Sequence, residues 1–151
     1  ELAGPVKKIL ISRNIKMNSY SMSIGESLSY RGDLMSFIPL GPFTEKIGPK
    51  PDTVSPIKYT KESDSEQSLF GEIQSPVVIV GTSYSAGELW NFHGAIQFML
   101  GVGVINSAVE GEGPFVPMQT FLKDLSSRDD INPHVVIWEI PERYLDDFSL
   151  Q

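Results

Sequence analysis

The chain has 151 residues, which suits one domain with a sizeable core and is short for two packed domains. A composition that is 40% hydrophobic and 21% charged is ordinary for a folded globular protein, so intrinsic disorder is not expected. The net charge of −7 argues against a protein that binds nucleic acid through its phosphates, and the absence of cysteine excludes disulfides, thiolate chemistry and cysteine-based zinc sites.

The first half of the chain, residues 1–75, gives few regular signals. It begins without an initiator Met or a signal-peptide pattern, so we expect a mature form, an engineered expression product or a fragment of a longer protein. The apolar residues of "KKILISR" favour a strand over residues 7–13. The polar segment over residues 47–68, which contains three prolines, is typical of an exposed loop.

The second half, residues 76–146, alternates between two kinds of pattern. Continuous β-branched or apolar runs predict buried strands, and apolar residues at helical spacing predict helices between them. On the second of these helices, Pro114 and Pro117 are tolerable only near the first turn. The expected elements are a strand over 77–81, a helix over 85–101 with a buried Trp90 and Phe98, a strand over 103–108, a helix over 113–127 and a strand over 133–140.

This βαβαβ order defines the expected fold class. Strands without polar alternation, separated by helices, form parallel sheets that are covered on both faces. We therefore predict an α/β protein in which residues 1–151 form a single domain, with its core over residues 76–146.

Polar residues follow each predicted strand, at residues 81–83, 106–111 and 139–143. Because ligands bind at the carboxyl ends of parallel strands, these three segments are expected to face one crevice. Ser83 lies at the turn from a strand into a helix, where free backbone N–H groups can stabilise an oxyanion. Ser85, two residues later, serves equally well as a helix N-cap.

Three stretches carry a resemblance to a known family: "PVVIVGTSYSA", "NSAVEGEGP" and "VVIWEIPERYL". In this order and spacing they resemble the SGNH-hydrolase-like domain of alginate O-acetylation proteins of the AlgJ and AlgX type, over roughly residues 30–146. The resemblance implies a three-layer α/β/α, flavodoxin-like domain with a parallel sheet. It also implies that this chain is the carboxyl-terminal portion of an incomplete domain.

The resemblance also assigns roles to residues. It implies that Ser83 is the nucleophile and that the Gly111 N–H helps to bind the oxyanion. Two positions depart from the SGNH pattern, because Ala108 stands at a glycine position and Glu142 at an asparagine position. Arg143 is as compatible with a structural clamp as with a substrate contact. The candidates for substrate binding are Tyr84, Asn106 and Arg143.

A serine nucleophile needs a base, which is usually a histidine oriented by a carboxylate. The chain has two histidines, of which His93 lies inside a predicted helix and His134 at the opposite end of the last predicted strand. We expect both to be structural or surface residues. In the family that the chain resembles, an Asp-x-His motif lies upstream of the serine, and because this chain has none, we expect the acid–base half of the site to lie outside it.

The function that the resemblance implies is O-acetylation of a bacterial exopolysaccharide similar to alginate, through an acetyl-Ser83 intermediate. It implies an acetyl donor, a polysaccharide acceptor and membrane-bound acetylation proteins as partners. From the acidic charge and the lack of metal-ligand spacing we expect no nucleic acid and no metal, and we expect no cofactor. The resemblance further implies a periplasmic location and an inner-membrane anchor upstream of Glu1. Two alternatives stay open, which are a carbohydrate esterase on the same scaffold and a non-catalytic module for polysaccharide binding or assembly.

Overall fold

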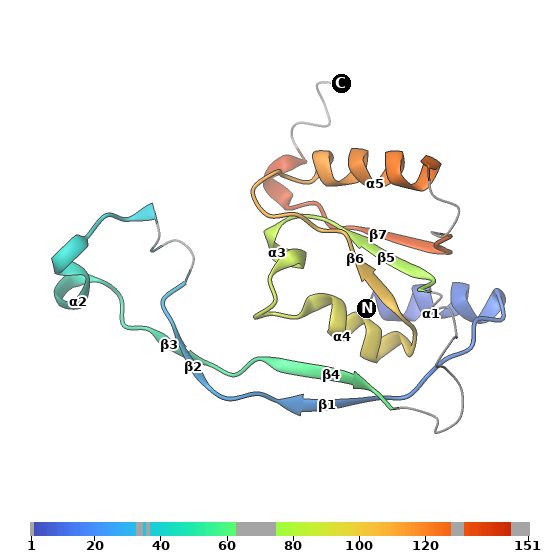
Figure 1. Ribbon diagram of the computed structural model, residues 1–151, viewed down its shortest axis with the longest axis horizontal. Helices are drawn as coiled ribbons and strands as arrows, with labels where there is room; N and C mark the ends of the chain where they lie inside the picture. Colours follow the sequence, from blue (N-terminus) through green and yellow to red (C-terminus); the bar gives the residue numbers. More distant parts are fainter. Residues whose placement is uncertain (1, 33–34, 36, 63–74, 128–131, 146–151) are drawn as a thin grey trace.

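The computed structural model describes residues 2–32, 35, 37–62, 75–127 and 132–145. It has two parts, a layered body of helices and parallel strands and a long antiparallel ribbon that runs beneath the body and extends to one side (Figure 1). We call these parts the body and the ribbon. No helix in the described part of the chain has both the length and the apolar character needed to cross a membrane.

The body is built on a three-stranded parallel sheet. Strand β5 (Val77–Val80) lies in the centre, between β6 (Val104–Asn106) and β7 (Val135–Trp138). The register places Val78 opposite both Ile105 and Val136. All four side chains of β5 are fully buried, which explains why its sequence is β-branched throughout rather than alternating.

Two helices cover one face of this sheet. Helices α1 (Ala3–Ser12) and α4 (Phe92–Leu100) pack against the side of β5 that carries Val77 and Ile79. Leu10 of α1 is fully buried in the same cluster. Burial of side chains of this size contributes about 1.5–3 kcal/mol each, so this cluster is a main source of stability.

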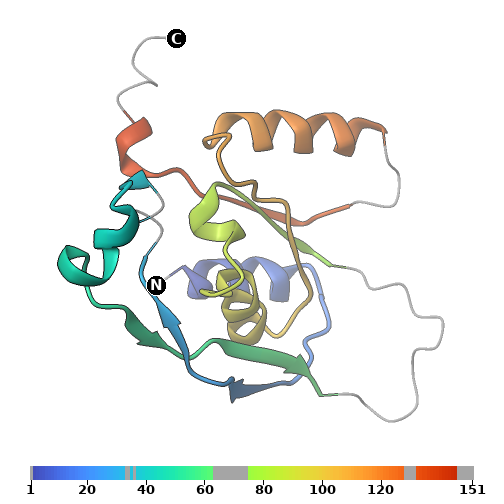
Figure 2. The ribbon, with the colours of Figure 1, turned by 60° about the vertical axis from the view of Figure 1, so that its left-hand side comes forward.

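The other face of the sheet is covered by helix α5 (Phe115–Ser127). Its Phe121 packs against Val78 and Val80, which point to the opposite side from Val77 and Ile79. Figure 2 shows α5 on one side of the sheet and α1 and α4 on the other. The predicted α/β class with a parallel sheet between helical layers is therefore confirmed, as is the order of strands and helices over the second half.

The strand predicted over residues 7–13 is wrong, because this segment belongs to α1. Val6 and Leu10 are four residues apart and are buried together, whereas Ile9 and Ile11 are 44% and 59% exposed. Apolar residues that recur at this spacing lie on one face of a helix, and that face packs against the body. The run of β-branched residues concealed this period.

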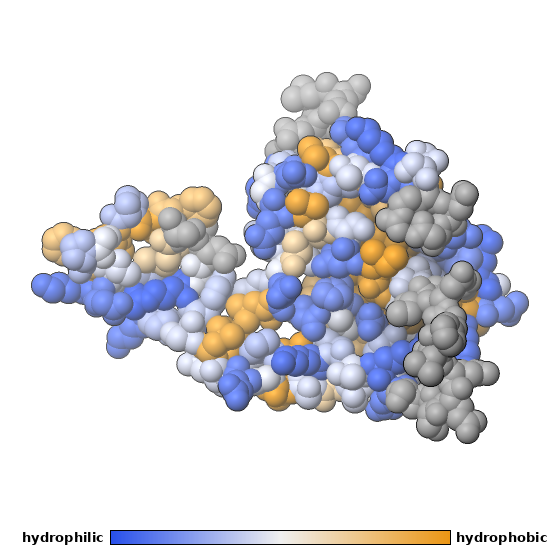
Figure 3. Space-filling model, in the orientation of Figure 1, coloured by the Kyte–Doolittle hydropathy of each residue, from blue (hydrophilic) through white to orange (hydrophobic). Residues whose placement is uncertain are grey.

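The loop predicted over residues 47–68 is wrong for residues 52–54 and 57–61, which form two strands of the ribbon, and its last part, residues 63–68, lies outside the described residues. The ribbon consists of two successive pairs of antiparallel strands. The break between the two pairs lies where the Gly25 N–H bonds to Pro56 O at 2.8 Å. The tip of the ribbon carries exposed apolar side chains and has a hydrophobic surface. A second hydrophobic surface lies where the ribbon meets the body (Figure 3). The ribbon contains β1 (Tyr20–Ile24) paired with β4 (Ile57–Lys61), β2 (Leu28–Tyr30) paired with β3 (Asp52–Val54), and at its tip η2 (Gly41–Phe43) and α2 (Thr44–Ile47).

The helix predicted over residues 85–101 is divided into two. A single turn, α3 (Ser83–Ala86), follows β5, and α4 starts only at Phe92. Between them, Asn91 adopts a left-handed conformation (φ 43°), and its side-chain oxygen caps α4 by accepting from the Gly94 N–H at 3.2 Å. The Asn91 amide also donates to Ile57 O at 2.8 Å, so the break in the helix attaches the body to the ribbon.

Two aromatic contacts join the ribbon to the body at the same place. The ring of Tyr59 lies 5.4 Å from that of Phe98, and Tyr30 meets Trp90 edge-on at 5.6 Å. Trp90 and Phe98 are nevertheless 51% and 41% exposed, so their predicted burial is wrong. They face the ribbon rather than the core.

Candidate functional site

The carboxyl ends of the three parallel strands meet, as the sequence predicts. The Val109 N–H donates to Gly81 O at 3.1 Å, which attaches the loop after β6 to the end of β5. The Thr82 N–H donates to a carboxylate oxygen of Glu139 at 2.7 Å, which attaches the end of β7 to the same turn. We call residues 81–84, 106–111 and 139–144 the strand-end site.

Ser83 is the first residue of α3 and is exposed. Thr82 precedes it as the N-cap, and the Thr82 hydroxyl accepts from the Tyr84 N–H at 3.5 Å. Within the described residues, no hydrogen-bond acceptor is placed against the Ser83 N–H. Because α3 is only one turn long, this N–H group acts by itself here rather than through a helix macrodipole.

The N-cap role considered for Ser85 is wrong, since Thr82 caps α3. Ser85 is 1% exposed, and its hydroxyl has no hydrogen-bond partner within the part of the chain that the structure describes. Of the two serines, only Ser83 is accessible to a substrate. This distinction makes Ser83 the candidate nucleophile on structural grounds as well.

The loop after β6 is fixed by Asn106. Its amide donates to Ser85 O at 2.8 Å, and its side-chain oxygen accepts from the Ala108 N–H at 3.2 Å. Gly111 lies beyond this anchor in an exposed turn with φ +80°, a conformation that favours glycine. Its N–H bonds to none of the described residues. Asn106 therefore holds the loop, and Gly111 presents an open backbone donor.

Glu139, at the end of β7, lies in the segment 139–143 that was expected at the site, but sequence reasoning assigned it no role. Its carboxylate accepts from the N–H of Thr82 at 2.7 Å and also from the Thr82 hydroxyl, at 2.9 and 3.2 Å from the two carboxylate oxygens. A Cβ atom on Gly81 would lie 2.6 Å from Glu139 Oε2 and 2.8 Å from its Cβ. The sequence signal was an acidic residue at the end of a strand that was predicted to be buried, although the side chains of β7 are half-buried or exposed.

Neither histidine bonds to Ser83 among the described residues. The Nδ1 atom of His93 lies 3.4 Å from the amide nitrogen of Asn106, so His93 is closer to the site than its position inside a helix suggested. His134 is exposed, and its N–H donates to Pro76 O at the amino end of the sheet.

Arg143 is an exposed cation at the edge of the site. Its Nη1 atom donates to the Tyr84 hydroxyl at 3.5 Å, and its guanidinium lies 5.7 and 5.0 Å from the ring centres of Tyr84 and Tyr144. Hydrogen bonds to these two hydroxyls raise the pKa of Arg143 above its already high usual value. No carboxylate of the described residues forms an ion pair with it. Tyr84 and Arg143 thus form one unit beside Ser83.

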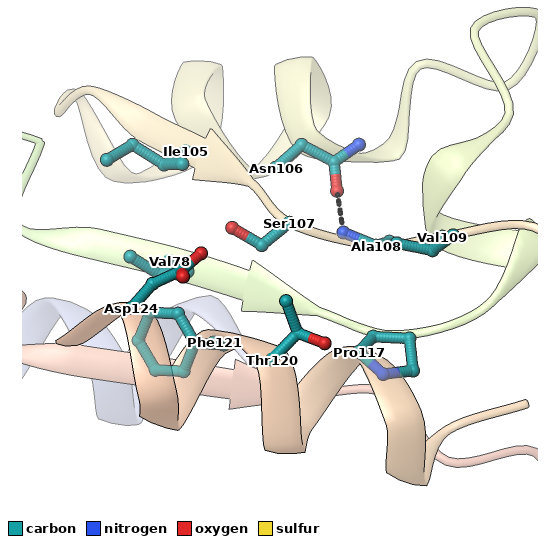
Figure 4. Close-up of a pocket in the computed structure, with 10 residues that line it drawn as sticks. All are labelled: Val78, Ile105, Asn106, Ser107, Ala108, Val109, Pro117, Thr120, Phe121 and Asp124. Atoms are coloured by element: carbon teal, nitrogen blue, oxygen red, sulfur yellow. Dashed lines mark hydrogen bonds between the residues drawn. The ribbon is translucent and has the colours of Figure 1, made fainter. Parts of the chain in front are cut away.

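A cavity of about 350 Å³ lies next to the site, between β6 and α5 (Figure 4). Its wall includes Ile105 and Phe121, with the polar side chains of Ser107 and Asp124. Asn106 lines it as well, but Ser83 does not. The cavity therefore adjoins the back of the loop after β6 rather than the face that carries the candidate nucleophile.

A parallel sheet between helical layers, with a serine on the turn after its central strand and a glycine-containing loop after the neighbouring strand, defines an SGNH-like α/β protein. The chain belongs to the family described as "SGNH hydrolase-like domain, acetyltransferase AlgX", which it matches over residues 1–142. The resemblance seen in the three sequence stretches is therefore confirmed.

Individual relatives agree with this membership. The chain is 44% identical to "Probable alginate O-acetylase AlgJ" of Azotobacter vinelandii over 77% of its own length and 30% of the relative's. It is 38% identical to the protein of the same name from Pseudomonas putida, over 96% of its own length and 39% of the relative's. The solved O-acetyltransferase domain of Pseudomonas putida AlgJ superimposes with a TM-score of 0.72 and 34% identity, over 95% of this chain and 48% of that one. The chain thus spans less than two fifths of the length of these curated relatives.

Proposed function

We propose that the protein carrying this chain is an O-acetyltransferase that acts on an alginate-like polysaccharide, with Ser83 as its nucleophile. The observation that carries the proposal is the position of Ser83, exposed after the central strand and next to N–H groups without internal acceptors. Membership of the family, and relatives named as alginate O-acetylases, support the reaction class.

In the proposed reaction, the Ser83 oxygen attacks the carbonyl carbon of the acetyl donor while a base takes the serine proton. The oxyanion that forms is stabilised by the N–H groups of Ser83 and Gly111. When this intermediate collapses, the bond to the donor breaks and the leaving group takes the proton from the base. A sugar hydroxyl then attacks acetyl-Ser83, loses its own proton to the base, and leaves with the acetyl group as the serine regains a proton.

The base in this scheme is the histidine of an Asp-x-His motif outside the 151 residues. His93, which contacts Asn106, and His134, which lies at the other end of the sheet, take no part in this scheme. A histidine held by a carboxylate is the usual partner of a serine nucleophile, because it accepts the proton near neutral pH and returns it to the leaving group.

Arg143 and Tyr84 are proposed to bind the acceptor. A polyuronate carries a carboxylate on each sugar, and an exposed guanidinium held between two tyrosine rings offers it a rigid cationic partner. This local charge offsets the overall charge of −7, which would otherwise repel a polyanion. Asn106 contributes by holding the loop, since its amide is already bonded to Ser85 O.

The remaining parts of the proposal concern location and partners. An enzyme that modifies an exported polysaccharide acts in the periplasm, next to membrane-bound acetylation proteins that deliver the acetyl group. The relatives named "Probable alginate O-acetylase AlgJ" and the family model named for acetyltransferase AlgX support the acetylation function on which this setting rests.

The test is acetyl transfer by the protein expressed from its complete reading frame, with a chromogenic acetyl ester as donor and deacetylated alginate as acceptor. Ser83→Ala is expected to lower transfer by roughly 10³-fold or more, because no other group replaces the nucleophile. Ser85→Ala is the matched control, since it removes a buried hydroxyl without a partner and should leave transfer unchanged.

The alternatives give different results in the same assay. A carbohydrate esterase would release acetate to water at the same rate with or without the polysaccharide. A non-catalytic module would bind the polysaccharide equally well with Ser83→Ala and would form no acetyl-enzyme detectable by mass spectrometry. Either result would end the proposal of a transferase.

A further inference from the structure

The Thr82 and Glu139 side chains control the backbone on both sides of the candidate nucleophile. The Thr82 N–H donates to the Glu139 carboxylate at 2.7 Å, and the Tyr84 N–H donates to the Thr82 hydroxyl at 3.5 Å. Between these two bonded groups lies the Ser83 N–H, with no acceptor among the described residues. Of three consecutive N–H groups, only the middle one is left for a substrate.

The carboxylate sets the direction of the Thr82 hydroxyl. An ionised carboxylate only accepts hydrogen bonds, so the hydroxyl 2.9 Å from Glu139 Oε2 must donate its proton to it. The lone pairs of the same hydroxyl then remain for the Tyr84 N–H. A glutamine at position 139 would put an NH₂ donor where Glu139 has an acceptor oxygen. The two hydrogen bonds that lead from Glu139 through the Thr82 hydroxyl to the Tyr84 N–H would then have no fixed donor and acceptor.

Steric fit holds this arrangement in place. The Glu139 N–H bonds to Val80 O at 2.8 Å, so the ladder between β5 and β7 fixes the backbone from which the carboxylate extends. Across the ladder, Gly81 has no side chain, and a Cβ there would lie 2.6 Å from the carboxylate oxygen. The glycine therefore provides the space that Glu139 occupies.

We propose that Glu139 is a positioning residue, whose carboxylate holds the Gly81–Thr82–Ser83 turn so that the Ser83 hydroxyl and N–H both face the substrate. This inference rests on the proposed function. It assigns to Glu139 no contact with the acetyl group and no proton transfer. Its effect is to keep the nucleophile and the oxyanion donor in reacting geometry.

The experiment compares Glu139→Gln with Glu88→Gln, in the protein expressed from its complete reading frame. Glu88 lies on the body outside the strand-end site, is exposed, and its carboxylate accepts no hydrogen bond from the described residues, so it matches the charge change without the contact. We expect Glu139→Gln to lower kcat by about 10- to 100-fold, with KM for the polysaccharide nearly unchanged, because small misplacements of reacting groups cost this much. Labelling of Ser83 by a fluorophosphonate should slow by a similar factor. Glu88→Gln should behave as wild type.

Thr82→Val provides a second route to the same contact and decides the matter if Glu139→Gln does not fold. If Glu139 acts through Thr82, then Thr82→Val also lowers kcat. The kcat of the double variant should then be no lower than that of the less active single variant. Wild-type kcat in both single variants, with Ser83→Ala inactive, would overturn the positioning role alone. Full additivity in the double variant would overturn it too. Undiminished transfer by Ser83→Ala would overturn the proposed function, and with it this inference.

Discussion

The body and the ribbon are stabilised by different interactions. In the body, the four side chains of β5 are completely buried between helices on both faces. In the ribbon, every side chain of β1 is exposed or half-buried, and the backbone ladder with β4 supplies most of the order. The strand-end site lies entirely on the body, so its geometry depends on core packing, whereas the ribbon should tolerate substitution.

The strongest test of this difference is Ile79→Ala in β5. Ile79 is fully buried against α4, and truncation should lower the free energy of unfolding by about 2–5 kcal/mol through lost burial and the cavity that remains. Urea unfolding followed by circular dichroism measures this value. A loss below about 1 kcal/mol would mean that the body is not the stable part of the molecule.

Gly81→Ala should have the next largest effect on stability, and it separates stability from catalysis. The added methyl group meets Glu139 at 2.6–2.8 Å, so the carboxylate must move away from Thr82. We expect unfolding to become easier by about 1–3 kcal/mol, as for other overpacked sites, and acetyl transfer to fall further than this loss of folded protein explains. Transfer measured at a temperature where the variant is fully folded tests this; an unchanged rate there would contradict it.

Phe98→Ala removes one of the aromatic contacts between the body and the ribbon. The ring lies 5.4 Å from Tyr59 and is 41% exposed, so we expect a loss of only about 1 kcal/mol. Hydrogen exchange should become faster in β1 and β4 but remain slow in β5. Equal acceleration in all three strands would show that the two parts unfold together.

Ile24→Ala is the smallest expected change and the counterpart of Ile79→Ala. The same side chain is truncated, but Ile24 is 72% exposed on β1, so the free energy of unfolding should change by less than about 0.5 kcal/mol. A loss comparable to that of Ile79→Ala would indicate that another surface covers the ribbon in solution.

The sequence predicted those parts of the fold whose burial leaves a regular pattern of apolar residues along the chain. The β5 run is apolar because helices cover it on both faces, and such burial leaves a continuous pattern. Most side chains in the strands of the ribbon are exposed, so no alternation marks them, and their partners lie up to 41 positions away, as for Tyr20 and Lys61. In α1, β-branched residues on the exposed side concealed the helical period.

The candidate site divides in the same way. Ser83 could be found because a serine directly after a buried strand has a position that follows from the strand itself. Glu139 could not, since its importance depends on which strand lies beside β5 and on the absence of a side chain at Gly81. The contact between His93 and Asn106 was likewise hidden, because it joins α4 to the end of β6.

Two backbone-anchored bonds join the strand ends directly, from Val109 to Gly81 and from Thr82 to Glu139, and within the described residues the crossover between β5 and β6 adds contacts only from α3 and from His93 of α4. Insertions or deletions elsewhere in the crossovers during evolution would therefore leave these bonds unaltered. A slip of β7 by one residue against β5 would not, because it would turn Glu139 to the opposite face and bring an apolar neighbour to Thr82. The register of β7 against β5 therefore determines the geometry of the strand-end site more than the length of the connecting segments does.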